Sequence, residues 1–580
     1  MKSTQKKVSG ADLPTRWHGV VFECKAWGLR MQRAVQNVYH RIPRHAPGQH
    51  LPNGRLLSES SSPLWSGEET ARMLVAGKIH NLRQAARHLD GLVIPAGKIF
   101  SFWKQIGRAT HQRGYAQGRE LREGCIIPTV GGGLCQLSNG IYDAALQAGL
   151  EVVERHRHSQ VIAGSLAEQD RDATVFWNYR DLRIRASHPW LLQVKMDGRH
   201  LSVRILADRH QDKHIPLVAV QPQKHRAPDA MGDCTQCGRT DCYLHVGDIP
   251  LHTHKTWLVT EEEWPEFTQW RQQQAGKQDK LLSTVAQADA APPLGTRIAN
   301  FNSRLMRRFH IWRGHPLPVA HNSRFSHIAR NLMRQLDASD THLVIPQSLL
   351  PWLWMAGELR GREYDVLMTA LPIPDIQRRL DEAVQLYPQT TTLSDFRADQ
   401  LLMQAEQEAL AAASHWVTPH AEILKLAGAK GIALPWLVPE LKPTASEQSA
   451  PPDTGQKPKV MLAASSLARK GVYELREALR TLDMPVQLLL PPGAAETPDL
   501  WDGFNVQRTA SMLEGIRQAD VVVLPAWVEH MPRGLLQAIA LGKPVLATSA
   551  CGLTADLAWT PITPGDVEGL NQALTNALKP

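Results

Sequence analysis

The stretch LPAWVEHMPRGLLQAIA, residues 524–540, is the most informative part of this sequence. An apolar run ends at Leu524, a loop carries Glu529, and Pro532 suits the first turn of a helix. This order places a carboxylate and free backbone N–H groups at the carboxyl end of a buried strand, where open α/β sheets bind phosphate-bearing ligands. The alternative is an ordinary strand-to-helix turn with a solvated glutamate.

Short apolar runs recur on both sides of this stretch, and a helical segment separates each run from the next. Continuous runs of this length are typical of buried parallel strands. The expected strands are 343–345, 365–368, 416–418, 460–463, 486–490, 521–524 and 545–547. A linker at 443–457, rich in Ser, Pro and Thr, divides them. We therefore expect two Rossmann-like α/β lobes, 296–445 and 456–580, with a cleft between them.

The carboxy-terminal part resembles the group 1 glycosyltransferases of the GT-B fold, which clasp a nucleotide-sugar between two lobes. The segment 459–475, with Ala468-Arg469-Lys470-Gly471, is similar to their phosphate loop. The resemblance implies that Glu529 contacts the donor sugar as a catalytic residue. The donor-binding residues that it implies are Arg469, Lys470, Gly471, Arg533 and Gln537.

Two positions depart from the family pattern. Gln537 stands where the family has a second glutamate, and Ser465-Ser466 stand where it has glycine and arginine. An amide can still hydrogen-bond a ribose hydroxyl, but it lacks the negative charge of a carboxylate.

A glycine-rich turn in the amino-terminal half carries a cysteine, in the sequence VGGGLCQLS at 130–138. Cys135 falls in the first turn of a predicted helix, where the helix dipole favours a thiolate. Downstream lie His156, His158 and Asp172, so that cysteine, histidine and aspartate could act as nucleophile, base and orienting group. The alternative is a small buried cysteine under a glycine turn, with the histidines on the surface.

This region resembles the VanW family, named for a protein found with vancomycin-resistance genes. The resemblance covers about 95–187, in blocks at Ser101-Phe102-Trp103, 131–138, Glu154-Arg155, His158-Ser159 and 172–175. It implies a link to the cell envelope, and many members of the family are exported. Here the basic start at 1–7 is not followed by an apolar segment, so we expect no cleaved secretory signal.

The VanW-like region is expected to be an α+β domain over 66–207. The expected strands are 173–177, 182–185, 191–195 and 201–205, the last two joined by a turn at Asp197-Gly198. Residues 1–65 are expected to be irregular, and 259–295 are expected to be a linker.

A cluster of soft ligands lies within residues 208–258. Cys234, Cys237, Cys242 and His245 have spacings that suit a tetrahedral zinc knuckle. We expect structural zinc, because four protein ligands leave no open coordination position. An iron–sulfur site and a loop of reduced thiols are the alternatives.

Composition narrows the class of protein. The chain has 580 residues, 43% hydrophobic and 21% charged, as in multidomain globular proteins. No run approaches the roughly 20 apolar residues of a membrane span. The net charge of +9 suits nucleotide-sugars, anionic lipids or nucleic acid. Because basic and aromatic residues are not interleaved, we do not expect nucleic acid to be the partner.

The leading hypothesis is a cytoplasmic glycosyltransferase fused to a VanW-like domain. It would transfer a sugar from a nucleotide-sugar to an envelope-related acceptor, with peripheral membrane contact, and the family resemblance implies retention at the anomeric carbon. One alternative is a binding protein in which Gln537 and Ser466 mark a transferase lobe that has lost its activity. Another is a VanW-type enzyme with Cys135 as its nucleophile.

Overall fold

A computed structural model describes most of the chain. The described residues are 16–39, 41–46, 51, 54–65, 72–122, 125–158, 166–177, 179–208, 232–233, 253–261, 263–284, 317–390, 392–394, 397–441 and 457–579. The chain forms two compact units. The first contains 1–255, 336–342 and 357–363, and the second contains 256–335, 343–356 and 364–580.

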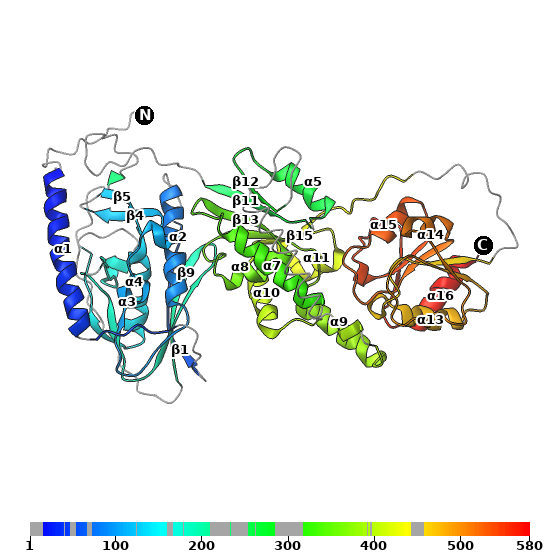
Figure 1. The fold of residues 1–580 in the computed structure, drawn as a ribbon, viewed down its shortest axis with the longest axis horizontal. Helices are drawn as coiled ribbons and strands as arrows, with labels where there is room; N and C mark the ends of the chain where they lie inside the picture. The colour runs from blue at the N-terminus through cyan, green and yellow to red at the C-terminus, as the bar shows by residue number, and fades with distance from the viewer. Residues whose placement is uncertain are drawn as a thin grey trace. The chain divides into compact units, whose positions relative to one another are not determined.

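The largest sheet of the first unit is antiparallel, with the strand order β1-β9-β8-β2. Figure 1 labels two of its strands, β1 and β9. Its strands are β1 (Gly54–Pro63), β2 (Leu92–Ile94), β8 (Trp190–Met196) and β9 (His200–Asp208). The predicted hairpin is confirmed as β8 and β9, in which Val194 lies opposite Val203. Both valines are fully buried, and burial of this face sets the register of the pair.

Two helices cover this sheet and complete its core. They are α2 (Arg72–Leu89) and α4 (Leu134–Gln147), and each buries apolar residues at helical spacing. Two small sheets have the orders β10-β5-β4 and β3-β7-β6. The smaller elements are β3 (Phe100–Ser101), α3 (Phe102–Ile106), β4 (Gln117–Arg122), β5 (Cys125–Val130), β6 (Glu151–Glu154), β7 (Arg183–Arg185) and β10 (Gly232–Asp233).

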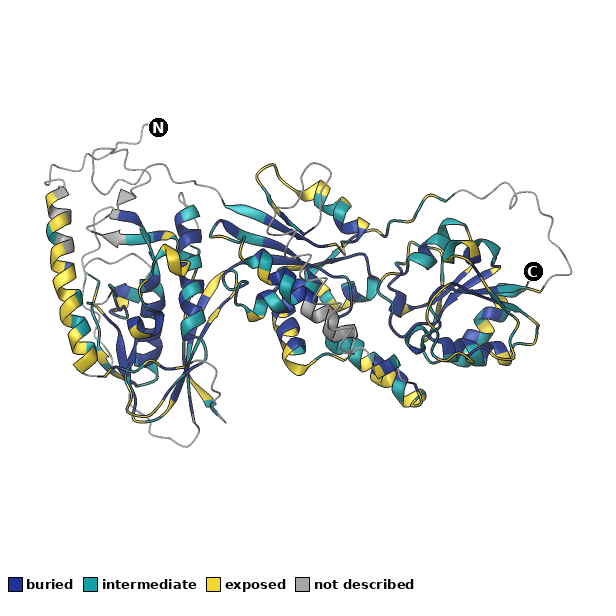
Figure 2. Cartoon of the chain, in the orientation of Figure 1, coloured by how far each residue is buried: buried dark blue, intermediate teal, exposed yellow. Residues whose placement is uncertain are grey.

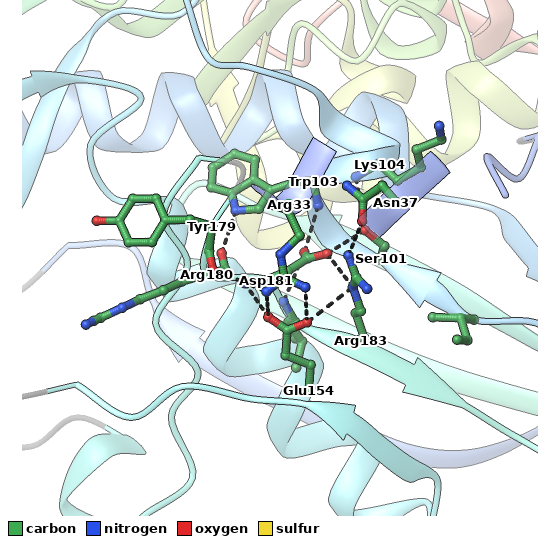
Figure 3. A network of polar contacts seen from close by, with 12 residues as sticks. Arg33, Asn37, Ser101, Trp103, Lys104, Glu154, Tyr179, Arg180, Asp181 and Arg183 are labelled. Carbon is green, nitrogen blue, oxygen red and sulfur yellow. Dashed lines mark hydrogen bonds and ion pairs between the residues drawn. The ribbon is translucent and has the colours of Figure 1, made fainter. Parts of the chain in front are cut away.

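The amino-terminal segment is more regular than the sequence indicates. It contains α1 (Arg16–Tyr39), which leaves most of its apolar side chains in solvent (Figure 2). Polar contacts hold this helix: Arg33 donates two hydrogen bonds to Glu154, and Asn37 accepts one from Arg183 (Figure 3). Because these contacts are polar, hydrophobic periodicity gives no signal for the helix.

Strand β1 also lies where the sequence predicts irregular structure. Its serine-rich residues are joined to β9 by a backbone ladder, and the Ser58 hydroxyl donates to the Ala144 carbonyl. Conversely, the strand expected at 173–177 is absent from the described residues there, apart from one isolated bridge at Phe176. The backbone of Ala173 is bonded to the Asn139 side chain instead of to a neighbouring strand.

The second unit begins with a six-stranded sheet of order β12-β11-β13-β14-β15-β16. Its elements are β11 (His254–Val259), α5 (Pro265–Gln274), β12 (Lys280–Ser283), α7 (Leu317–Met333), β13 (Asp340–Pro346), α8 (Leu350–Met355), β14 (Glu363–Leu367), α9 (Ile373–Leu386), α10 (Gln400–Ala412), β15 (His415–Thr418), α11 (Ala421–Ala427) and β16 (Gly431–Ala433). The expected linker at 259–295 therefore contains α5 and β12. Strand β12 pairs in parallel with β11, whose Trp257 and Leu258 are buried in the core.

A second six-stranded sheet follows, with the order β19-β18-β17-β20-β21-β22, and all of its pairs are parallel. Its elements are β17 (Lys459–Leu462), α13 (Val472–Arg480), β18 (Gln487–Leu490), β19 (Val506–Arg508), α14 (Met512–Gln518), β20 (Val521–Leu524), α15 (Arg533–Ala540), β21 (Val545–Thr548), β22 (Thr560–Ile562) and α16 (Val567–Leu578). Every residue of β20 is buried, as expected for a central parallel strand.

The expected fold class is confirmed. An α+β region with antiparallel sheets precedes two Rossmann-like α/β lobes, the arrangement expected of the GT-B fold. Within the described ranges, no helix has both the length and the apolar character that crossing a bilayer requires.

Candidate active sites

The loop between β20 and α15 holds Glu529 in a tight set of contacts. One carboxylate oxygen lies 2.8 Å from the Lys470 ammonium, and the other accepts a hydrogen bond from the Met531 N–H at 2.9 Å. Burial alone would raise the pKa of Glu529, but the Lys470 charge and these hydrogen bonds hold it below its usual value. Glu529 is therefore a partly buried, ionised carboxylate at the carboxyl end of β20.

The predicted phosphate loop packs directly on this segment. Gly471 has a φ of 76°, and a Cβ there would lie 2.0 Å from the carbonyl oxygen of Pro525. The Arg469 carbonyl accepts a hydrogen bond from the Trp527 N–H at 3.0 Å. Glycine is thus required for the close approach of the two loops, and α13 begins directly after it, with the N–H groups of its first turn lacking intrahelical acceptors.

Gln537 and Ser466, the two departures from the family pattern, have different surroundings. The amide oxygen of Gln537 on α15 is buried and has no hydrogen-bond partner. A ligand hydroxyl could therefore satisfy it. Ser466 is buried, and its hydroxyl accepts a hydrogen bond from the indole N–H of Trp501 at 3.0 Å. Ser466 is thus part of the lobe's internal packing.

Arg533, which the family resemblance implies as a donor-binding residue, makes its polar contacts with the preceding lobe. Its guanidinium donates two hydrogen bonds of 2.6 Å to Glu266, which is on α5 of the preceding lobe and has a fully buried side chain. Glu266 also accepts from the Leu437 N–H. Burial opposes ionisation of Glu266, yet Arg533 keeps its pKa below the usual value. Arg533 therefore links the two lobes of the second unit.

His420, at the end of β15, is a site residue that the sequence analysis missed. Its Nε2 lies 3.1 Å from the Glu529 carbonyl oxygen, and its ring fills the space where a Cβ at Gly552 would lie. Burial lowers the pKa of His420 and lowers that of the adjacent His530 to about 3, so both imidazoles are neutral. The sequence offers one signal for His420: like Glu529, it is a polar residue that follows an expected strand.

The structure brings Cys135, His158 and Asp172 together in the first unit. His158 Nδ1 lies 2.5 Å from an Asp172 carboxylate oxygen. The Cys135 Sγ lies 3.8 Å from both the Thr174 hydroxyl and the Val175 carbonyl, and the thiol interacts electrostatically with the His158 imidazole. His156, the other candidate histidine, lies 3.0 Å from Glu154 instead.

The charges of these three residues support one another. Burial opposes ionisation of Cys135, but the His158 imidazole lowers the pKa of the thiol overall. Burial would lower the pKa of His158, but Asp172 and Cys135 raise it to about 9. The pKa of Asp172 is held low against burial by His158 and Arg155. The lowered pKa of the thiol and the raised pKa of the imidazole both shift the pair toward thiolate and imidazolium.

The expected zinc ligands Cys234, Cys237, Cys242 and His245 lie outside the described residues, so the zinc knuckle stays a prediction. Across the described part of the chain, no group of three or more His, Cys, Asp or Glu is arranged to hold a metal ion.

Two family models match the chain. The model described as "VanW like protein" matches residues 77–206, and that described as "Glycosyl transferases group 1" matches residues 458–579. The second match supports glycosyl transfer as the general activity of the carboxy-terminal lobe.

Two curated relatives match the amino-terminal half. The uncharacterized protein YoaR of Bacillus subtilis (strain 168) is 30% identical over 147 residues, which are 25% of this chain and 48% of that protein. The chain thus spans about half the length of that relative. The vancomycin B-type resistance protein VanW of Enterococcus faecalis (strain ATCC 700802 / V583) is 28% identical over 203 residues, 33% of this chain and 73% of that protein.

Solved structures match a little over half of the chain at low similarity. Sucrose-phosphate synthase from Thermosynechococcus elongatus is 14% identical, with a TM-score of 0.34, over 56% of this chain and 90% of that one. A UDP-forming trehalose-phosphate synthase from Burkholderia xenovorans is 11% identical, with a TM-score of 0.33, over 56% and 92%. Scores this low carry no argument, and the two parallel sheets themselves define the α/β lobes. The chain thus joins a VanW-like domain at residues 77–206 to a group 1 glycosyltransferase domain at residues 458–579.

Proposed function

We propose that the second unit transfers a sugar from a nucleotide-sugar to an acceptor of the cell envelope, in the cytoplasm and with peripheral contact to the membrane. The observation that carries the proposal is the partly buried, ionised Glu529, paired with Lys470 where the predicted phosphate loop meets the end of β20. A carboxylate beside a cation at this edge of a parallel sheet suits a donor with sugar hydroxyls and a diphosphate.

In this proposal, different groups of the chain bind different parts of the nucleotide-sugar donor. Glu529 accepts hydrogen bonds from the sugar, and the free amide oxygen of Gln537 accepts one from the ribose. Lys470, Arg469 and the first-turn N–H groups of α13 face the diphosphate. When the bond between the anomeric carbon and the phosphate oxygen breaks, these groups stabilise the charge on the leaving diphosphate, and the acceptor oxygen bonds the carbon with retained configuration.

The test uses the full-length protein with a panel of nucleotide-sugars. Thermal shift reports binding, since a ligand of the native state raises apparent stability, and release of nucleoside diphosphate reports turnover. Glu529→Gln is expected to lower turnover roughly 10²-fold, the scale of losing one well-placed polar group. Asp556→Asn, which neutralises an exposed carboxylate in the same lobe, is the matched control and should have no effect. Equal turnover of wild type and Glu529→Gln would remove Glu529 from the donor site.

A non-catalytic binding role is the second candidate, because three features of the lobe serve other contacts. Lys470 is paired with Glu529, Arg533 with Glu266, and Ser466 is bonded to Trp501. Stabilisation by nucleotide-sugars without release of diphosphate would favour this candidate. If no nucleotide or nucleotide-sugar binds, both candidates are rejected.

A further inference from the structure

The thiol cluster of Cys135, His158 and Asp172 is assembled from three separate segments of the VanW-like domain. Cys135 begins α4, His158 follows β6, and Asp172 lies in the irregular segment after residue 169. The His158–Asp172 distance of 2.5 Å leaves Nε2 of the imidazole as the nitrogen that can face Cys135. The imidazole thus interacts with the thiol and is hydrogen-bonded to the carboxylate, the order of groups that activates a nucleophile.

Surrounding contacts hold the carboxylate and the imidazole in place. The Asp172 carboxylate accepts a hydrogen bond of 2.7 Å from Arg155 and another of 2.7 Å from the His158 N–H. Arg155 also donates to Asp170 and lies over the Tyr142 ring at 4.8 Å. These bonds fix the two residues relative to each other before any substrate arrives.

Helix α4 supports the carboxylate segment directly. The Ser138 hydroxyl donates to the Ala173 carbonyl at 2.6 Å, and the Asn139 side chain accepts from the Ala173 N–H at 2.8 Å. The helix that carries Cys135 is therefore hydrogen-bonded to the residue that follows Asp172. This contact ties the position of the thiol to that of the carboxylate.

The histidine segment is anchored at its other end by the polar network in Figure 3. Glu154, the last residue of β6, accepts hydrogen bonds from Arg33 at 2.8 and 2.5 Å. It also lies 3.3 Å from the Arg183 guanidinium. The segment 155–158 is thus held by Glu154 on one side and by Asp172 on the other.

Cys551 offers a contrast within the same chain. It is completely buried, and burial together with the Glu529 charge raises the pKa of its thiol to about 12. Cys135 is partly exposed and has its pKa lowered by His158. Cys551 has the features of an inert core thiol, and Cys135 has those of a reactive one.

We propose that Cys135, His158 and Asp172 form a second active site, in which the Cys135 thiolate attacks the carbonyl carbon of an amide or ester substrate. The sulfur–carbon bond forms as the carbonyl π pair moves to oxygen, where the N–H groups at the start of α4 stabilise the charge. Collapse breaks the bond to the leaving nitrogen or oxygen, which takes the proton of His158 Nε2. Water then attacks the thioester carbonyl carbon and gives a proton to His158. The sulfur–carbon bond breaks, which releases the carboxylic acid and restores the Cys135 thiolate.

The reaction is tested on the full-length protein with p-nitrophenyl acetate as the acyl probe. We expect a burst of nitrophenolate and one acetyl group on the peptide that contains Cys135, identified by mass spectrometry. His158→Gln should slow acetylation roughly 10²-fold, the lower range for loss of an acid–base group, because the imidazolium no longer stabilises the attacking thiolate. Cys24→Ser removes an exposed thiol outside the cluster and should leave the burst unchanged.

Labelling of the wild-type protein with iodoacetamide at neutral pH gives a second measure that needs no variant. Cys135 should be alkylated roughly tenfold faster than the exposed Cys24, because a lowered pKa increases the thiolate fraction. The proposal is overturned if Cys135 reacts only in denaturant, if Cys24 reacts faster, or if His158→Gln is acetylated at the wild-type rate.

Discussion

The thiol cluster and the predicted donor site both lie at the start of a helix, but the charged groups at the two sites are arranged differently. Each lies at a helix that starts from a glycine in the left-handed region, Gly133 with a φ of 94° before α4 and Gly471 with a φ of 76° before α13. At the first site the charges converge on Cys135. At the second, Lys470 and Glu529 neutralise each other, and a donor must exchange that contact for its own.

This difference separates a site prepared for a reaction from one prepared for a ligand. In the thiol cluster, the carboxylate and the imidazole raise the reactivity of one atom without any substrate present. In the proposed donor site, the Lys470–Glu529 pair compensates the partial burial of Glu529, and the sugar and diphosphate of a donor would replace this pair. The two sites also differ in which parts of the chain form them. The thiol cluster lies within one domain, whereas the predicted donor site includes contacts between two lobes, such as that of His420 with Glu529.

The largest expected effect is the loss of stability when the ion pair between Arg533 and Glu266 is removed. Arg533→Gln leaves the fully buried Glu266 carboxylate without its cation, and should lower the free energy of unfolding of the second unit by about 3 kcal/mol. Because the pKa of Glu266 is lowered, its contribution to stability is present above its ordinary pKa and is lost as pH falls through the lowered value. Urea titrations at neutral and acidic pH measure both effects.

Arg480→Gln provides the control for this change, because it removes an exposed pair with Glu477 and should cost less than about 0.5 kcal/mol. If both variants unfold alike, Arg533 does not hold the lobes. Alkylation of Cys135 should be unchanged in Arg533→Gln, which would confirm that the two sites are independent.

Substitution of the glycines that precede α13 and α4 should give the next largest loss of stability. Gly471→Ala should cost about 3 kcal/mol, because the new Cβ meets a backbone carbonyl at 2.0 Å in a strained conformation. Gly133→Ala should also cost more than backbone strain alone, because its Cβ would lie 2.2 Å from Lys78 Cγ and 2.9 Å from Lys78 Cβ. Gly542→Ala, with a φ of 67° and open space, isolates the backbone strain and should cost about 1 kcal/mol. Denaturant unfolding of the three variants tests this order, and a Gly471→Ala protein as stable as Gly542→Ala would contradict it.

The sequence predicts the elements whose signal is local, and not the contacts between distant segments. Each residue of β20 is apolar, so this strand is predictable from the run alone. The contact of Arg533 with Glu266 is not predictable, because the two residues lie 267 positions apart and no pattern in the chain connects them. The residues of the thiol cluster are identified by type, but their convergence depends on Arg155 and on irregular backbone, which have no periodicity. Helix α1 escapes prediction because its contacts with the core are polar.

The smallest predicted effect tests the charge coupling within the thiol cluster. The groups that face Cys135 and His158 are the Asp172 carboxylate and, behind it, the Arg155 guanidinium. Asp172→Asn removes the charge that raises the pKa of His158, so the imidazolium is lost at lower pH and the pKa of the thiol rises. Iodoacetamide labelling of Cys135 at pH 7 should then slow roughly tenfold, the effect of about one pKa unit.

Asp170→Asn is the matched control, because both aspartates bind Arg155, at 2.8 and 2.7 Å, and only Asp172 contacts His158. The pH profile of labelling, followed by mass spectrometry from pH 5 to about 9, should move toward that of an ordinary thiol in Asp172→Asn alone. If the two variants give the same profile, the carboxylates serve only to bind Arg155. Cys135 would then owe its lowered pKa to His158 without help from Asp172, and the cluster would act as a cysteine–histidine pair.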